Sequence, residues 1–380
     1  MKVPFSKPYF TDEDLDEILS KMRDVLASGW LTSGKNVEAL EKTFAEMLGV
    51  KEAIALNSCT AGLHAILIAM GIKSGDEVIV PTNTFVATAN AALYTGAKPV
   101  FADSDPDTFN ISPEDVERKI TSRTKAMIVV HLAGNPCDMK ALSEIAADHH
   151  ISLLEDCAHA HGARTLGRSC GTFGEAAAFS FYATKIITTG EGGIVTTDDE
   201  EIARRVRRIR THGRGGVGPV ETTELGFNYR MPDIQAVIGL SQIKHLSDFV
   251  TQRQETAQYY NRLVTESEQG TPQLVRDGDT CPYYVYIVKL SNAKMTRDEL
   301  IRRLGEKGIG TSVLYYPVHT QPFYRDILRE NAQCPIAEQL GRSTLALPMF
   351  NGMSSDQLHN VESAWRNACE PVVEQYASLN

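Results

Sequence analysis

A series of short, continuous apolar segments constrains the fold of this chain more than any other feature of its sequence. Each segment has the pattern of a strand, and most are followed by Gly, Pro or Asp and then by a helical pattern. Because the apolar residues do not alternate with polar ones, we expect strands covered on both faces, as in a parallel sheet flanked by helices. The segments are KEAIALN (51–57), DEVIVP (76–81), AKPVFAD (97–103), KAMIVVH (125–131) and ISLLED (151–156).

Two further segments, AAAFSF (176–181) and GGIVTTD (192–198), are predicted to form a hairpin around Lys185. Beyond about residue 250 the pattern changes to a long polar helix, then a strand and another helix. At 380 residues the chain is too long for one small core. We therefore predict a large domain over residues 1–250, including an N-terminal arm, and a smaller α+β domain over residues 251–380.

Composition argues against several classes of protein. The 38 Lys and Arg residues against 48 Asp and Glu give a formal net charge of -10, so we expect neither nucleic acid nor a membrane as a partner. The densest basic run, RRVRRIR (204–210), follows acidic residues and is interpreted as a solvated helix with intrahelical ion pairs. The seven cysteines form no CxxC pair, which fits a reducing cytoplasm. Neither a signal peptide nor a membrane-spanning segment is indicated.

The segment NSCTAGLHA (57–65) places small polar residues between a predicted strand and a predicted helix. Such a turn leaves backbone N–H groups unpaired at the helix N-terminus, where a phosphate can bind with help from the helix dipole. Thr60 and Ala61 would supply those donors. The same segment also suits simple N-capping by Ser58 or Thr60, so by itself it leaves both interpretations open.

The segment EDCAHAHGA (155–163) places Asp156 at the carboxyl end of a predicted strand, where open α/β sheets bind ligands. The carboxylate could hold a cationic ring nitrogen or cap the next helix, and the segment does not decide between them. The adjacent Cys157, His159 and His161 would also suit zinc. Because no second ligand pair with zinc-like spacing occurs elsewhere in the sequence, we predict no metal site.

Lys185 lies between the apolar AAAFSF segment and TTGEGG, whose glycines allow close backbone approach. Most lysines are solvated cations at the surface. Burial lowers the pKa of an ammonium group and frees the neutral amine, which is the form that makes a Schiff base. We therefore interpret Lys185 as a carbonyl-binding lysine.

Three of these features describe parts of one ligand, in chain order. The NSCTAGLHA turn suits a phosphate, Asp156 suits a ring nitrogen and Lys185 suits an aldehyde. Pyridoxal phosphate carries all three groups, and proteins hold it through a lysine and through a carboxylate that pairs with the pyridinium. The conjunction of the three, rather than any one motif, predicts pyridoxal phosphate as the cofactor.

The chain also resembles the DegT/DnrJ/StrS family of sugar aminotransferases. The resemblance runs from VPFSKP at residue 3 to LALP at residue 345. It implies the aspartate aminotransferase type of α/β fold, with a mostly parallel sheet in a large cofactor-binding domain and a small C-terminal domain. The segments that carry it are SGWLTSG, SCTAGLHA, GDEVIVPTNTFVATANA, GAKPVFAD, TKAMIVVHLAGNPCDM, EDCAHAHGA, GTFGEAAAFSFYATKIITTGEGG, LGFNYRM and YYPVH.

The resemblance implies a role for several residues around the cofactor. Lys185 matches the imine-forming lysine, and Asp156 matches the carboxylate that pairs with the pyridine nitrogen. The phosphate contacts of the family match Thr60, Ala61 and Ser180. Some relatives carry histidine in place of the lysine and dehydrate their sugar, so the lysine here argues for transamination.

Further matches concern the cofactor ring and a second subunit. Phe85 matches the aromatic residue that stacks on the ring, and His159 stands where many members have glutamine, near the phenolic oxygen. Asn228 matches the asparagine that reaches the phosphate of the neighbouring subunit's cofactor. The resemblance therefore implies an active homodimer with shared sites.

The predicted substrate residues depart more from the family pattern. The VLYYPVH segment supplies Tyr315, Tyr316 and His319 where the family often has a histidine and a tyrosine before the prolines. Arg214 and Arg230 lie in segments suited to meeting a diphosphate, and Arg230 is taken as a predicted substrate contact. These departures leave the identity of the sugar open.

The implied activity is transfer of an amino group from an amino acid, with glutamate as the expected donor, to a nucleotide-linked keto-sugar of the 4-keto-6-deoxy type. The product would be an amino sugar for a surface polysaccharide, a glycoprotein or an antibiotic. Two alternatives remain open from the sequence. One is an aminotransferase for a free cyclitol ketone of the scyllo-inosose type, and the other is a non-catalytic sensor that binds the cofactor without turnover.

Overall fold

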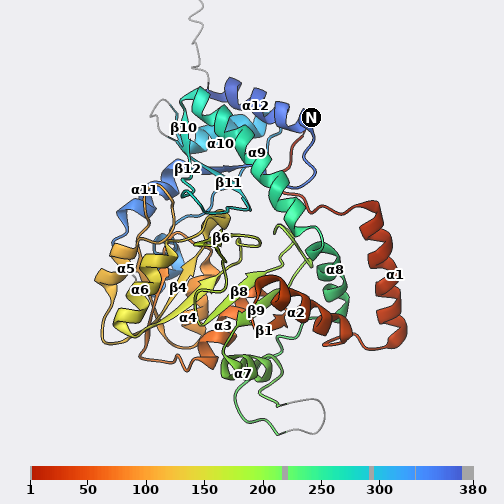
Figure 1. Ribbon diagram of the computed structural model, residues 1–380. Coiled ribbons are helices and arrows are strands. Elements are labelled where there is room, and N and C mark those ends of the chain that lie inside the picture. The colour runs from red at the N-terminus through yellow and green to blue at the C-terminus, as the bar shows by residue number, and fades with distance from the viewer. Residues whose placement is uncertain (1, 216–220, 291–294, 330, 370–380) are drawn as a thin grey trace, which may run out of the picture.

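The computed structural model describes residues 2–215, 221–290, 295–329 and 331–369, and in this part of the chain its largest element is a seven-stranded sheet (Figure 1). The strands of the sheet are β1 (Glu52–Leu56), β2 (Glu77–Pro81), β3 (Lys98–Ala102), β4 (Thr124–Val130), β5 (Ser152–Asp156), β8 (Ala176–Ser180) and β9 (Gly193–Thr197). Their order is β1-β9-β8-β5-β4-β2-β3. β9 pairs antiparallel with both of its neighbours, and the other pairs are parallel.

The predicted α/β fold with a mainly parallel sheet is therefore confirmed. Each of the apolar segments singled out in this half of the sequence forms a strand of the sheet. The predicted hairpin is formed by β8 and β9, and Lys185 lies in the loop between these two strands.

Helices cover both faces of this sheet. One face packs against α3 (Cys59–Ala69), α4 (Val86–Tyr94) and α7 (Glu200–Arg210). The other face packs against α2 (Lys35–Leu48), α5 (Pro113–Lys119) and α6 (Met139–His149). Outside α2 lie α8 (Asp233–Ile243) and then α1 (Asp12–Ser28), at the edge of the molecule (Figure 1).

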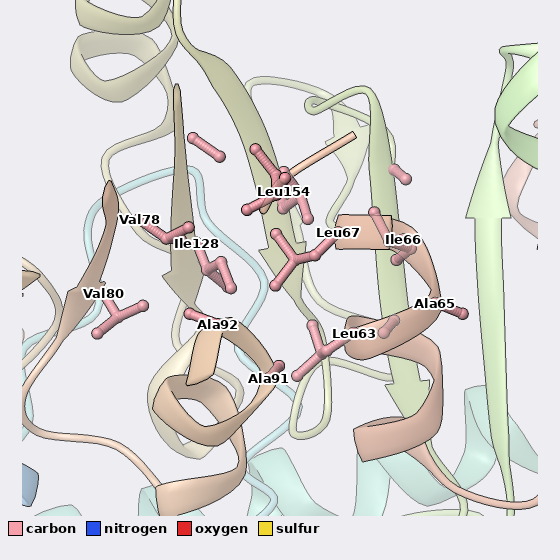
Figure 2. Packing of buried hydrophobic residues seen from close by; sticks show 14 of the residues in the cluster. Leu63, Ala65, Ile66, Leu67, Val78, Val80, Ala91, Ala92, Ile128 and Leu154 are labelled. Carbon is pink, nitrogen blue, oxygen red and sulfur yellow. The ribbon is translucent and has the colours of Figure 1, made fainter. Parts of the chain in front are cut away.

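Strand β4 shows why the apolar segments are continuous. Ala126 and Ile128 join the core cluster under α3 and α4, whereas Met127 and Val129 join the cluster under α5 and α6. Figure 2 shows Ile128 beside Leu154 of β5, facing the apolar side chains of α3 and α4. Successive strand residues point to opposite faces, so burial of both faces requires apolar residues at every position.

The basic run lies on α7, as predicted for a solvated helix. Its apolar residues, among them Val206 and Ile209, are buried against the sheet. Arg204 pairs with Glu201 of the same helix at 2.5 Å. Arg207 and Arg210 pair instead with Glu52 and Glu41, each at 2.6 Å. Ion pairs thus engage arginines of this run, partly within the helix and partly with neighbouring elements.

The C-terminal part of the chain forms a second, smaller sheet. It contains β10 (Gly270–Pro272), β11 (Tyr286–Leu290) and β12 (Thr344–Leu347), all antiparallel. Three helices surround its core, α9 (Leu246–Ser267), α10 (Arg297–Glu306) and α12 (Ser355–Cys369). The predicted domain division at residue 250 falls inside α9, and the division into 1–250 and 251–380 stays a prediction.

Short elements complete the description. They are η1 (Leu132–Gly134), β6 (Arg164–Thr165), β7 (Arg168–Ser169), η2 (Val318–Thr320), η3 (Phe323–Ile327) and α11 (Pro335–Ser343). Among the helices of the described residues, none combines the length and the apolar character that crossing a membrane demands.

Candidate active site

A cavity of about 470 Å³ opens at the carboxyl ends of the parallel strands. This is the edge at which open α/β sheets bind ligands, because the loops that follow the strands gather there. The predicted site residues that line the cavity are Thr60, Phe85, Asp156, His159, Ser180, Lys185 and Tyr315. Residues far apart in the sequence therefore meet in one place.

Asp156 is the last residue of β5, and its carboxylate is almost fully buried in the cavity wall. One oxygen, Oδ2, accepts a hydrogen bond of 2.8 Å from the hydroxyl of Thr88, and Oδ1 accepts one of 3.1 Å from the N–H of Ala158. Burial raises the pKa of Asp156 above its ordinary value, although these hydrogen bonds oppose the shift. A cation within the cavity would favour the ionised form.

Helix α3 begins at the cavity, and Ser58 caps it. The Ser58 Oγ accepts a hydrogen bond of 3.1 Å from the N–H of Ala61, which is buried outside the cavity lining. Within the described residues, no hydrogen bond occupies the N–H of Cys59 or Thr60. Capping and anion binding are thus compatible at this turn, but the cap occupies the N–H of Ala61, one of the two donors predicted for the phosphate, and leaves those of Cys59 and Thr60. The role predicted for Ala61 stays a prediction.

Lys185 lies in the loop after β8, half-buried at the cavity wall. Its backbone N–H donates to the carbonyl of Tyr182 at 2.9 Å. The Nζ atom lies 4.3 Å from the ring centroid of Tyr284, a cation–π distance. The hydroxyl of Tyr284 is 2.8 Å from that of Thr184, which fixes the ring beneath the amine. The amine therefore faces both the cavity and an aromatic surface.

His159 stacks on the Tyr284 ring, with centroids 4.3 Å apart. Its Nδ1 accepts a hydrogen bond of 3.3 Å from the N–H of Ala133, and its Nε2 lies 3.2 Å from the hydroxyl of Tyr315. Burial holds the pKa of His159 well below its ordinary value. The neutral ring therefore carries its proton on Nε2 and donates to the Tyr315 oxygen, which leaves the Tyr315 hydrogen available to the cavity.

The other predicted site residues lie outside the cavity lining. Tyr316 is exposed beside Arg297, and buried His319 lies 2.6 Å from the hydroxyl of Thr82 through its Nδ1. Asn228 is exposed, and its backbone carbonyl accepts from the side chain of Asn57. Arg230 lines a different cavity, of about 1090 Å³, which also contains Arg214 and Trp30. The roles predicted for these residues remain predictions.

Comparison with known proteins decides the family. A profile of the DegT/DnrJ/EryC1/StrS aminotransferase family matches residues 12–366. The chain belongs to this family. Its members are sugar aminotransferases that depend on pyridoxal phosphate, so the protein is a pyridoxal-phosphate-dependent aminotransferase.

Similar proteins agree with the family over nearly the whole chain. Spore coat polysaccharide biosynthesis protein SpsC of Bacillus subtilis is 40% identical, over 96% of both chains. GDP-perosamine synthase of Escherichia coli O157:H7 is 37% identical, over 99% of both chains. The solved PLP-form of Spr1654 from Streptococcus pneumoniae superposes with a TM-score of 0.91 at 27% identity, covering 97% of this chain and 99% of that one.

The residues present in this DegT/DnrJ/EryC1/StrS aminotransferase fit pyridoxal phosphate. The unpaired N–H groups of Cys59 and Thr60 suit the phosphate, and Asp156 offers a carboxylate to a ring nitrogen. The amine of Lys185 faces the same cavity, and Phe85 offers an exposed aromatic ring at its wall. We therefore take this cavity as the candidate cofactor site.

The histidines and the cysteine considered for zinc diverge in this aminotransferase. His159 stacks in the cavity, whereas His161 is buried among phenylalanines, and neither of its nitrogens has a hydrogen-bond partner in the part of the chain that the structure describes. The thiol of Cys157 instead lies with His131 and Glu155 in a buried group. Both ring nitrogens of His131 are already used, one by the N–H of Cys137 at 3.1 Å and one by Glu155 at 3.1 Å. The group has the character of a hydrogen-bonded core rather than of a metal site.

Sequence reasoning missed several residues of the cavity wall. Tyr284 lies in a segment that showed only the pattern of a strand, so nothing in the sequence pointed to its ring. Thr84 and Cys59 lie inside segments that were singled out, and their small polar side chains were the available signal. The hydrogen bond from Thr88 to Asp156 became visible only in the folded chain.

Proposed function

We propose that this aminotransferase moves an amino group from glutamate to a nucleotide-linked keto-sugar of the 4-keto-6-deoxy type, in the biosynthesis of an amino sugar. The observation that carries the proposal is the 37% identity to GDP-perosamine synthase over 99% of both chains. The name of that relative describes a nucleotide-linked product, and SpsC is named for polysaccharide biosynthesis. The cavity with Lys185 and Asp156 supports the same chemistry.

The proposed mechanism assigns the proton transfers to Lys185. Bound pyridoxal phosphate would supply a carbonyl that exchanges with amino groups and a ring that accepts electrons from a deprotonated carbon. Lys185 would hold the cofactor covalently between turnovers. Once released, its amine would take a proton from the carbon of the amino donor and carry that proton on Nζ. The Tyr284 ring, 4.3 Å from Nζ, would keep the released amine over the reacting centre.

The other residues of the cavity wall would bind the cofactor and orient it. Asp156 would hold a proton on the ring nitrogen, since a buried carboxylate favours an adjacent cation. The N–H groups at the start of α3 and the hydroxyl of Ser180 would bind the phosphate, and Phe85 would cover the ring. His159 orients Tyr315, whose free hydroxyl hydrogen would meet an oxygen of the bound cofactor or substrate.

We propose a homodimer as the active unit. Asn228 is exposed and lies outside this chain's own cavity lining, so its side chain is available to a second copy of the chain. Arg214 and Arg230 share a separate cavity with exposed Trp30, which would suit the diphosphate of a substrate at the shared site. Tyr316 and His319 would influence the substrate pocket only indirectly, through the loop that carries Tyr315.

A two-substrate assay tests the proposal. The purified enzyme is supplied with glutamate and either a nucleotide-linked 4-keto-6-deoxy sugar or a free cyclitol ketone, and the aminated product is measured by mass spectrometry. We expect product from the nucleotide-linked ketone only. Amination of the cyclitol ketone alone would favour the cyclitol alternative instead. If no amino acid bleaches the absorbance of the bound cofactor, the non-catalytic sensor is favoured. Lys185→Ala serves as the inactive control.

A further inference from the structure

Two threonine hydroxyls form a chain that ends on Asp156. Thr84 Oγ1 lies 2.9 Å from Thr88 Oγ1, and Thr88 Oγ1 donates to Asp156 Oδ2 at 2.8 Å. Both threonines are fully buried, and Thr84 also lines the candidate cofactor cavity. Thr88 belongs to the first turn of α4, so the chain of hydroxyls connects this helix to the end of β5.

The direction of these hydrogen bonds follows from the number of protons. A hydroxyl has a single hydrogen, and Thr88 gives its hydrogen to the carboxylate. Thr88 must therefore accept at the other contact, which makes Thr84 the donor there. Both hydroxyl dipoles consequently point toward Asp156, and each supports a negative charge on that carboxylate.

The other neighbours of the carboxylate also act as donors. The N–H of Ala158 donates to Oδ1 at 3.1 Å, and the thiol of Cys59 lies 4.0 Å from the same oxygen. Each oxygen of Asp156 is thus held by a donor on one side and retains lone-pair capacity toward the cavity. A threonine in the first turn of a helix can also bond a backbone carbonyl of its own helix, but Thr88 reaches across to another element instead.

We propose that Thr88, supported by Thr84, is a positioning residue that orients the Asp156 carboxylate and keeps it ionised for the ring nitrogen of the cofactor. The proposal rests on the role given to Asp156 under the proposed function. Thr88 would then contribute to cofactor binding only indirectly, by supporting the pairing of Asp156 with the ring nitrogen. Phe85 lies between the two threonines in the sequence, so the same turn of chain would set both the carboxylate and the aromatic ring.

The test compares two cofactor probes that differ at the ring nitrogen. Dissociation constants are measured by absorbance for pyridoxal phosphate and for its 1-deaza analogue, in which carbon replaces the ring nitrogen. Thr88→Val removes the hydroxyl and keeps the branched shape, while Thr88→Ser restores the donor. We expect Thr88→Val to weaken binding of pyridoxal phosphate about tenfold or more, as for loss of a hydrogen bond to a charged group, and to change binding of the 1-deaza analogue little.

The variants separate positioning from a merely structural role. Thr88→Ser should recover most of the loss, and Thr84→Val should show a smaller loss with the same selectivity for the nitrogen-containing probe. Equal weakening of both probes, or no weakening of either, overturns the proposal. If the Thr88→Val protein does not fold, Thr84→Val carries the same comparison by itself.

Two controls complete the experiment. Thr196→Val removes another buried hydroxyl, which donates to the carbonyl of Gly171 at 3.1 Å, and it should not change the ratio of the two dissociation constants. Asp156→Asn should abolish the preference of the wild-type protein for the nitrogen-containing probe. A wild-type protein whose preference survives Asp156→Asn would refute the role of Asp156 itself, whereas failure at Thr88 alone would leave that role standing.

Discussion

Replacing Glu155 by glutamine should destabilise the protein strongly, although only one atom changes its chemical type. Glu155 is fully buried beside Asp156, on the opposite face of β5. Its carboxylate accepts backbone N–H groups from Gly171 at 2.7 Å, Phe173 at 2.7 Å and Gly174 at 3.0 Å.

The fourth hydrogen-bond partner of the Glu155 carboxylate is Nε2 of His131, 3.1 Å from Oε2. Because Nδ1 of that ring accepts the N–H of Cys137, the hydrogen on Nε2 is the one that His131 donates to Glu155. The hydrogen bond from His131 and the N–H groups hold the pKa of Glu155 below its ordinary value, although burial alone would raise it. Four donors thus surround one anion.

The expected loss of stability follows from the hydrogen bonds that each carboxylate oxygen of Glu155 accepts. In Glu155→Gln the amide oxygen can still accept from Phe173 and Gly174, but the amide NH₂ then faces the donors of Gly171 and His131. Each buried donor left without an acceptor costs about 1–3 kcal/mol, so the expected loss is about 2–6 kcal/mol. This loss is a large fraction of the roughly 5–15 kcal/mol that stabilises an ordinary domain.

Urea unfolding of the apo protein, followed by circular dichroism, measures the effect. Glu201→Gln is the matched control, because Glu201 pairs with Arg204 at the surface and should contribute under about 1 kcal/mol. Since the folded-state pKa of Glu155 is lowered, its stabilisation is present above the unfolded value near 4.3 and is lost as pH falls through the folded value. Equal stability of the two variants at neutral pH would show that the four donors around Glu155 do not require an anion.

Three further changes have defined outcomes. Ser58→Ala removes the cap that accepts the N–H of Ala61 and should lower the free energy of unfolding by about 1 kcal/mol in urea titrations, with Ser58→Asp recovering most of it. Arg253→Met removes a buried guanidinium that donates to the carbonyl of Tyr284 at 3.0 Å and to other oxygens. We expect the free energy of unfolding, measured by thermal unfolding, to fall by about 3 kcal/mol or more. An unchanged melting temperature would contradict this. His159 stays neutral when folded but gains a proton near pH 6.5 when unfolded, so acidification below that pH should cost stability. His159→Gln should reduce that slope by up to about 1.4 kcal/mol per pH unit, and an identical slope would refute the assignment of a neutral ring.

The sheet could be predicted because its strands are buried on both faces. In β4 the residues from Ala126 to Val129 alternate between two cores and are all apolar, and this leaves a clear signal in the sequence. Asp156 and Lys185 could be placed at the cavity for a related reason. Asp156 ends β5, Lys185 lies in the loop after β8, and the carboxyl ends of these two parallel strands lie at one edge of the sheet.

Other parts of the site could not be predicted, because they depend on contacts between distant segments. Tyr284 contacts His159 and Lys185 across about a hundred residues of sequence, and its own segment shows only the apolar pattern of a strand. Thr88 was invisible for the same reason, since a threonine in the first turn of a helix has many possible partners. The orientation of a hydroxyl is set by tertiary packing rather than by sequence pattern.

We propose above that the amine of Lys185 holds the cofactor covalently. Borohydride reduction of the holoenzyme, followed by proteolysis and mass spectrometry, tests it most directly. We expect a pyridoxyl group on the peptide that contains Lys185, and none on that peptide in Lys185→Ala. If the protein binds pyridoxal phosphate but the modification is found on another lysine, or on no peptide, then Lys185 does not hold the cofactor.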